Sequence, residues 1–270
     1  MKSIIQFCIN SNIWVAFCVL GLVFSTEILL ETANFKISQF VFFSTIVAYN
    51  FQRTIRMKKE HEHSSKAWLD KNRRAIYILM FLAALINLYL FFGFKSSTQL
   101  AILFAGTLSV FYPFGIRKIP FAKIFIISFV WAVSAMLLLV LENNIPISQN
   151  IIWKFTSLFL FVFAITIPFD IRDIGYDSQD IITIPLFFGA QKAKNIAIFS
   201  LFICGIIAFF QYVEMSLIMP HLLALIFLYI LASIFIQKSD KSNGKMFFYF
   251  WVESLSLVSY FLLVISELIF

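Results

Sequence analysis

Four aspartates lie close together in the segment PFDIRDIGYDSQD, at Asp170, Asp173, Asp177 and Asp180. At about 100° per residue in a helix, their side chains fall within one stripe roughly 80° wide. Carboxylates on one helix face repel each other unless a cation lies between them. Their oxygens suit Mg²⁺, which binds proteins through one or two carboxylates together with substrate phosphates. The cluster predicts a site for Mg²⁺ and a diphosphate, and the alternative is a solvated acidic loop with Arg172 as its counter-charge.

The elements that must position this cluster are apolar. Of the 270 residues, 61% are hydrophobic and 13% are charged, whereas a soluble domain is about 45–50% apolar and about 25% charged. This composition excludes a soluble globular protein and a disordered chain. The apolar runs are continuous and about 17–22 residues long, which suits membrane-spanning helices, and they lack the alternation of outer-membrane β-strands. We therefore expect an all-α protein that crosses a membrane several times.

The runs predict a polytopic bundle of about nine membrane-spanning helices, which form one integral membrane domain over residues 1–270. The two long polar segments are RMKKEHEHSSKAWLDKNRR, between the second and third helices, and the stretch from Asp170 to Gln191. The expected helices cover residues 13–30, 37–55, 75–94, 99–114, 121–141, 151–169, 193–213, 217–236 and 246–269.

Basic residues indicate how the chain is oriented. If the loop between the second and third helices faces the cytoplasm, three of the 21 Lys and Arg residues lie on the other side, namely Lys36, Lys95 and Lys154. The remainder, Lys123 included, lie on the cytoplasmic side, and the positive-inside rule selects this orientation. We expect a bacterial-type inner (cytoplasmic) membrane, with the amino terminus inside and the carboxyl terminus outside. The net charge of +7 then reflects topology and attraction to anionic lipid headgroups, and no nucleic-acid partner is expected.

The acidic cluster is followed by Thr183-Ile-Pro185 and Gly189, and this order resembles the second aspartate-rich motif of the UbiA-type intramembrane prenyltransferases. In that family a DxxxD element precedes a Thr-Leu-Pro-like segment, a glycine and the next helix. The expected helix number, and the position of the motif at the end of the sixth helix, also resemble the family. A further likeness is Tyr112-Pro-Phe followed by Arg117 and Lys118, which is similar to the family's Tyr-Pro…Lys-Arg segment after the fourth helix.

The resemblance implies a helical bundle with a central cavity that is open to lipid and capped on its cytoplasmic side. Such a protein binds a prenyl diphosphate and Mg²⁺ in the cavity, ionises the diphosphate and transfers the prenyl group to a lipophilic acceptor. Metals and cationic side chains neutralise the charge of the leaving group best in a water-poor site. By the resemblance, the catalytic residues are Asp170, Asp173, Asp177 and Asp180, of which the first three hold Mg²⁺. The residues that bind the diphosphate are then Asn50, Tyr112, Arg117, Lys118 and Arg172.

The first aspartate-rich motif of the family, NDxxDxxxD at the end of the second helix, is degenerate in this chain. The corresponding segment, NFQRTIRMK, begins at Asn50, which matches the motif. Its three carboxylate positions hold Phe51, Thr54 and Lys58, none of which is an oxygen ligand of the required kind. One of the family's two metal positions is therefore missing from the sequence.

Two explanations for this departure remain open. In the first, Arg53 and Arg56 bind the diphosphate directly and replace the second metal ion, since arginine pairs bidentately with phosphate and residues three apart share a helix face. In the second, the protein has lost catalysis and only binds an isoprenoid lipid. A small-molecule transporter is a third and less favoured interpretation.

Glu253, in FYFWVESLSLVSY, is the most membrane-embedded acid of the chain. Acidic residues inside membrane-spanning segments are candidates for function because their burial is costly. The sequence leaves two interpretations open, a contact with a hydroxyl of the acceptor or a structural pair with a neighbouring Ser or Tyr.

Overall fold

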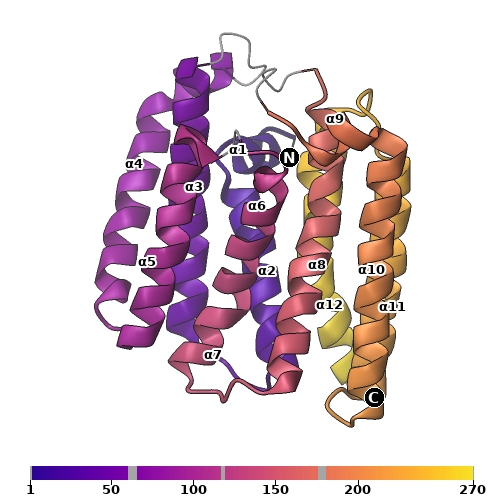
Figure 1. The fold of residues 1–270 in the computed structure, drawn as a ribbon. Coiled ribbons are helices and arrows are strands. Elements are labelled where there is room, and N and C mark those ends of the chain that lie inside the picture. The colour runs from indigo at the N-terminus through magenta and orange to yellow at the C-terminus, as the bar shows by residue number, and fades with distance from the viewer. Residues whose placement is uncertain (1, 60–65, 117–118, 176–180, 270) are drawn as a thin grey trace.

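A computed structural model describes the backbone of residues 2–59, 66–116, 119–175 and 181–269, and the side chains of residues 5–55 and of those from 68 onward within these ranges. All regular secondary structure in the described ranges is helical, with no β-strand among it. The expected all-α fold is thereby confirmed (Figure 1).

The helices follow one another with short connections. A 3₁₀ turn, η1 (Tyr112–Phe114), extends α5, and two π-helical segments, η3 (Val133–Leu137) and η4 (Phe247–Val252), continue directly into α7 and α12. The α-helices are α1 (Lys2–Asn10), α2 (Ile13–Leu29), α3 (Phe35–Lys59), α4 (Lys66–Phe91), α5 (Ser96–Phe111), α6 (Ala122–Ala132), α7 (Leu138–Glu142), α8 (Gln149–Arg172), α9 (Ile184–Phe188), α10 (Ala190–Val213), α11 (Met219–Lys238) and α12 (Glu253–Ile269).

Seven helical segments within the described residues are long and apolar enough to cross a membrane. Two further helices, α2 and α3, cover the ranges expected for the first two spans, but α2 has only 17 residues and α3 ends in a polar, basic turn. The expected count of nine spans therefore stays a prediction. The seven segments are Trp68–Phe91, Ser96–Phe114, Ala122–Glu142, Gln149–Arg172, Ala190–Val213, Met219–Lys238 and Phe247–Ile269.

The long helices run side by side and close into a bundle (Figure 1). Helix α8 packs against α6 and α10. Helix α12 packs against α2, so that the last helix of the chain lies beside the first long one. The last contact depends on Gly21, because a Cβ there would lie 2.9 Å from the Cα of Leu257. Figure 1 shows α3 and α8 ending at the upper end of the bundle and the carboxyl terminus at the lower end.

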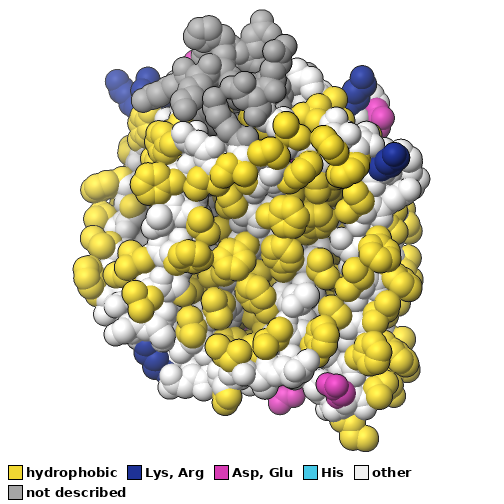
Figure 2. Space-filling model, in the orientation of Figure 1, with side chains coloured by type: hydrophobic (Ala, Val, Ile, Leu, Met, Phe, Trp, Pro, Cys, Tyr) yellow, Lys and Arg dark blue, Asp and Glu magenta, His cyan; other side chains and the backbone are white. Residues whose placement is uncertain are grey.

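The outer surface of the bundle is apolar. Only 17% of the span is buried in each of α4 and α5, and large side chains such as Phe81, Tyr89 and Phe199 point outward. In Figure 2 hydrophobic side chains cover most of one face, and the charged ones lie toward its two ends. A contiguous apolar surface of this size requires a non-aqueous surrounding. The chain is therefore a multi-pass membrane protein.

Two short helices lie outside the expected spans. Helix α1 precedes the first span and meets it at a corner where Asn12 has a left-handed backbone, with φ 60°. Helix α9 lies within the stretch from Asp170 to Gln191, which was expected to be a loop, and ends at Gly189 with φ 85°. Neither helix forms an apolar run long enough to be recognised as a separate helix in the sequence.

Candidate functional site

A cavity of about 810 Å³ lies inside the bundle. Residues of α3, α5, α6, α8 and α12 line it, together with the α1–α2 corner and the segment before η4. Much of its wall is apolar, with contributions from Val15, Phe40, Ile102, Ile127 and Ile165. The same cavity is also lined by Arg53, Lys123, Arg172, Lys241 and Lys245, so that it presents both hydrocarbon and cationic groups to a ligand.

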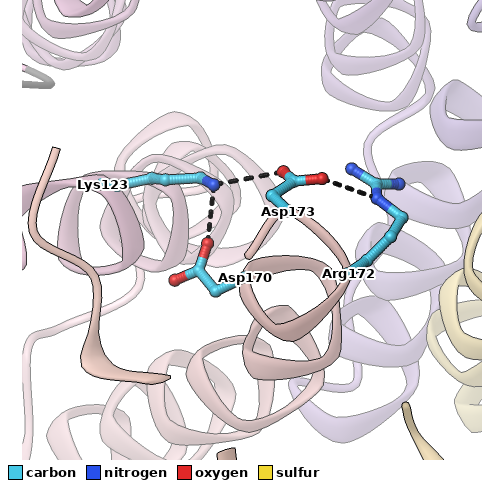
Figure 3. A network of polar contacts seen from close by, with 4 residues as sticks. All are labelled: Lys123, Asp170, Arg172 and Asp173. Atoms are coloured by element: carbon cyan, nitrogen blue, oxygen red, sulfur yellow. Dashed lines mark hydrogen bonds and ion pairs between the residues drawn. The ribbon is translucent and has the colours of Figure 1, made fainter. Parts of the chain in front are cut away.

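Three charged side chains at the end of α8 meet a lysine from α6 (Figure 3). The ammonium of Lys123 lies 2.7 Å from Asp170 Oδ1 and 3.3 Å from Asp173 Oδ2. The second oxygen of Asp173, Oδ1, accepts a hydrogen bond of 2.7 Å from Arg172 Nε. Only 8% of the Lys123 side chain and 1% of the Asp170 side chain are exposed. Burial at this level requires such pairing, because an isolated ion inside a protein is strongly unfavourable.

The position of this cluster follows from the ends of two helices. Asp170 lies in the last turn of α8 and Asp173 follows its end, where the helix dipole is negative and disfavours carboxylates. A cation is therefore needed there, and Lys123 supplies it from the first turn of α6. The start of α6 is anchored by Phe121, whose N–H donates to the carbonyl of Ile182 and whose ring packs against Phe187 of α9.

Arg172 is held by an ion pair and by aromatic rings. Its guanidinium lies 4.6 Å from the ring centre of Tyr249 and 5.2 Å from that of Phe169, which are cation–π distances. Nη1 of Arg172 is buried and has no hydrogen-bond partner among the described residues. The side chain lines the cavity. The guanidinium is therefore held by Asp173 and the rings at the wall of the cavity.

Arg53 of α3 lines the cavity next to the α1–α2 corner. Its Nη2 donates to Asn12 Oδ1 over 2.6 Å, and its Nη1 donates to the carbonyl of Asn10. Asn50 accepts from Asn12 Nδ2 over 2.9 Å and donates to the carbonyls of Ser11 and of its own helix. The structure thus places Asn50 beside the cavity, where its side chain bonds to the α1–α2 corner. The same corner accepts the hydrogen bonds of Arg53.

The residues that replace the first motif's carboxylates offer no metal ligand in the described part of α3. Phe51 lines the cavity with an apolar ring, and the hydroxyl of Thr54 donates back to the carbonyl of Asn50. Tyr112, the residue of η1 expected to position the diphosphate, is buried and lines the same cavity.

Several expected site residues lie outside the described part of the chain. The helical backbone at Arg56 is described but its side chain is not. Of the expected residues, the structure thus brings Arg53, Tyr112, Arg172 and Asp173 to the cavity wall and places Asp170 behind them. The residues outside the description are Asp177, Asp180, Arg117 and Lys118.

Sequence reasoning missed two residues of the site. In the sequence Lys123 is one of many basic residues on the expected cytoplasmic side, and its place in the first turn of an apolar run is the signal that could have singled it out. Tyr249 lies among six aromatic and apolar residues of η4 and has no distinguishing neighbour in sequence. Glu253, which the sequence singled out, lines the cavity and interacts electrostatically with Arg172 and Arg53.

These features define a class of protein, a multi-pass helical membrane protein with an internal cavity that is apolar on most of its wall and cationic near the ends of α3 and α8. The sequence profile of the UbiA prenyltransferase family matches residues 70–253. The chain therefore belongs to the UbiA prenyltransferase family. No curated protein sequence matches the chain.

Solved structures of similar fold come from the same family. A UbiA homolog from Aeropyrum pernix K1 superposes with a TM-score of 0.69 at 10% identity, over 94% of this chain and 97% of the homolog. A UbiA homolog from Archaeoglobus fulgidus bound to GPP and Mg²⁺ gives a TM-score of 0.68 at 13% identity, over 96% and 97% of the two chains. A digeranylgeranylglyceryl phosphate synthase gives 0.62 at 12% identity over the full length of both. At these identities the likeness shows a shared fold.

The family implies Mg²⁺, but the described residues do not fit an ion that bridges Asp170 and Asp173. The ammonium of Lys123 contacts an oxygen of each carboxylate and occupies the space between them. No group of three or more His, Cys, Asp or Glu side chains within the described ranges is arranged to hold a metal ion. Asp177, the third expected ligand, is outside those ranges. Mg²⁺ binding by this chain stays a prediction.

Proposed function

We propose that this chain is an intramembrane prenyltransferase, which binds a prenyl diphosphate in the central cavity and transfers the prenyl group to a lipophilic acceptor. The observation that supports this proposal most is that Arg53, Lys123 and Arg172 all line one cavity whose wall is otherwise largely apolar. A molecule with a strongly anionic head and a long hydrocarbon tail matches both kinds of wall. Family membership and the fold shared with a GPP-bound homolog support the same ligand class.

The reaction breaks the bond between the allylic carbon and the diphosphate oxygen. Negative charge develops on the departing diphosphate, and fixed cations in a site shielded from water stabilise such charge better than solvent does. Arg172 suits this role because Asp173 and Tyr249 hold its guanidinium in one orientation. The allylic carbon then bonds to a nucleophilic atom of the acceptor, which loses a proton. The apolar wall around Ile127 and Ile165 keeps water from capturing the allylic cation first.

The proposal also gives a role to the other expected residues, and the role of Asp170 and Asp173 differs from the expected binding of Mg²⁺. Tyr112 positions the diphosphate, and Asn50 acts through Asn12 to position Arg53. Asp170 and Asp173 orient Lys123 and Arg172. Arg56, Arg117 and Lys118 add positive charge, and Asp177 and Asp180 complete the acidic motif. We assign no step of the reaction to Mg²⁺.

The membrane setting is also part of the proposal. We infer an inner (cytoplasmic) membrane, with the amino terminus in the cytoplasm, the carboxyl terminus outside and the bilayer as the source of the acceptor. The basis is the distribution of Lys and Arg residues, and Lys2 and the basic run from Arg53 to Arg74 fall on the inner side.

A protein that binds an isoprenoid lipid without turning it over is the second candidate. The observation in its favour is the wall at the first motif, where Phe51 presents an aromatic ring and Thr54 bonds to its own helix. Neither residue stabilises a leaving group.

One experiment separates these candidates. The purified protein in lipid nanodiscs is incubated with radiolabelled geranyl diphosphate and a bacterial lipid extract, and lipid products are separated by chromatography. A labelled lipid product that is absent with Arg172→Ala supports the transferase. Saturable binding of the diphosphate without any product supports the lipid-binding protein, and absence of binding contradicts both.

A further inference from the structure

Among the described residues, Lys123 lies between two carboxylates in a largely buried cluster, and Arg172 pairs with one of them. Asp170 and Asp173 contribute two carboxylates, and Lys123 and Arg172 contribute two cations. Within one aspartate-rich motif of this kind, a divalent ion is the usual means of neutralising the carboxylates. Here side chains of the protein already do so.

Lys123 and a bridging divalent ion exclude each other. Mg²⁺ binds carboxylate oxygens at about 2.0–2.1 Å and repels other cations in the same space. Asp170 Oδ1 and Asp173 Oδ2, the oxygens that such an ion would join, both face the ammonium of Lys123 at 2.7 and 3.3 Å. Figure 3 shows the ammonium between the two carboxylates, with Arg172 on the far side of Asp173.

The lysine is fixed in this position by its surroundings. It lies in the first turn of α6 and is buried. The residue two positions earlier, Phe121, is anchored by its N–H to Ile182 and by stacking on Phe188. Moving the ammonium away would leave Asp170, with 1% of its side chain exposed, without that cation. The arrangement therefore favours retention of the lysine over its displacement by an ion.

We propose that Lys123 takes the place of a metal ion between Asp170 and Asp173, so that the ligand's diphosphate binds at this end of the cavity without a divalent ion at that pair. The degenerate first motif fits this interpretation, because Arg53 lines the cavity and directly precedes Thr54, which occupies a carboxylate position of that motif. The replacement of a metal ion by Lys123 does not depend on which reaction the protein catalyses. The binding of a diphosphate at this end of the cavity rests on the proposed function.

The first test uses Mn²⁺ alone as the probe, with binding followed by electron paramagnetic resonance in nanodiscs. In wild type Asp170 should hold no Mn²⁺, so the Asp170→Asn variant should bind Mn²⁺ to the same extent as wild type. Lys123→Met should gain a Mn²⁺ site at least about tenfold tighter than any in wild type, and Lys123→Met/Asp170→Asn should lose it. Lys154→Met is the matched control, since Lys154 is a partly buried lysine near the start of α8, at the opposite end of that helix from Asp170, and donates to the carbonyl of Leu29.

The second test measures the affinity of wild type for geranyl S-thiolodiphosphate, a non-ionising analogue, in EDTA and in excess Mg²⁺. The two affinities should agree within about threefold. A loss of more than about a hundredfold in EDTA, or Mn²⁺ binding by wild type that depends on Asp170, overturns the proposal. The wild-type and Asp170→Asn arms decide the question even where Lys123→Met does not fold. If the Mn²⁺ results hold but the analogue does not bind at all, the proposed function fails and the role of Lys123 stands.

Discussion

Replacing Arg172 by alanine should weaken prenyl diphosphate binding without unfolding the protein. The guanidinium is held by Asp173 through Nε and by the rings of Phe169 and Tyr249, and it keeps Nη1 unbonded among the described residues. Its replacement removes a cationic side chain from the cavity wall, while Lys123 stays in contact with both Asp170 and Asp173. The fold should therefore persist.

The size of the effect follows from the bond that is lost. A hydrogen bond to a charged group contributes about 1.5–3 kcal/mol. Removing one such bond from Arg172 to the diphosphate should weaken binding by about 10- to 150-fold. Arg172→Lys should recover only part of this loss, because lysine cannot bind Asp173 and the ligand through one planar group.

The assay is equilibrium binding of geranyl S-thiolodiphosphate to the protein in nanodiscs, with melting temperature as the check of folding. Arg73→Ala is the matched control, since Arg73 also lies over a tyrosine ring, 5.4 Å from the centre of Tyr77, but on the exposed surface. It should bind like wild type. If Arg172→Ala also binds as tightly as wild type and melts at the same temperature, the assignment of the diphosphate to this end of the cavity is refuted.

Three further predictions concern other parts of the molecule. At saturating Mg²⁺, Arg53→Ala and Arg56→Ala should each weaken analogue binding by about 10- to 150-fold, and wild-type affinity in both would show that neither arginine replaces a metal. Gly21→Val should lower the melting temperature, since its side chain meets the backbone of Leu257 and such overpacking costs about 1–3 kcal/mol; an unchanged temperature would show that α2 and α12 separate easily. Accessibility tags after residue 57 and within 176–180 should report the cytoplasm and a tag after residue 270 the outside, whereas a carboxyl-terminal tag in the cytoplasm would mean an even number of spans.

The helices could be predicted from sequence because their apolar runs are long. Burial in a bilayer requires about 20 apolar residues per helix, and the described ends of α8 and α10 lie within a few residues of the expected limits. Helix α1 was not predicted, because a nine-residue amphipathic stretch next to a membrane span forms no separate apolar run. Helix α9 was not predicted either, because it has only five residues, between a polar segment and a glycine.

The site was predictable only where its residues are neighbours in sequence. Asp170, Arg172 and Asp173 stand together in one segment, and Arg172 and Asp173 of this segment line the cavity. Lys123 lies 50 residues before Asp173, and only the packing of α6 on α8 shows that it pairs with the aspartates. Asn50 matches the first motif, but its bonds to the α1–α2 corner depend on a backbone turn that no motif predicts.

The most direct test of the central claim is an experimental structure of the protein in lipid with geranyl S-thiolodiphosphate bound. We expect the diphosphate to lie within hydrogen-bond distance of Arg172 and the geranyl chain to extend along the apolar wall beside Ile127 and Ile165. A ligand bound instead in the smaller pocket beside Lys154 and Tyr229, at the start of α8, would contradict it.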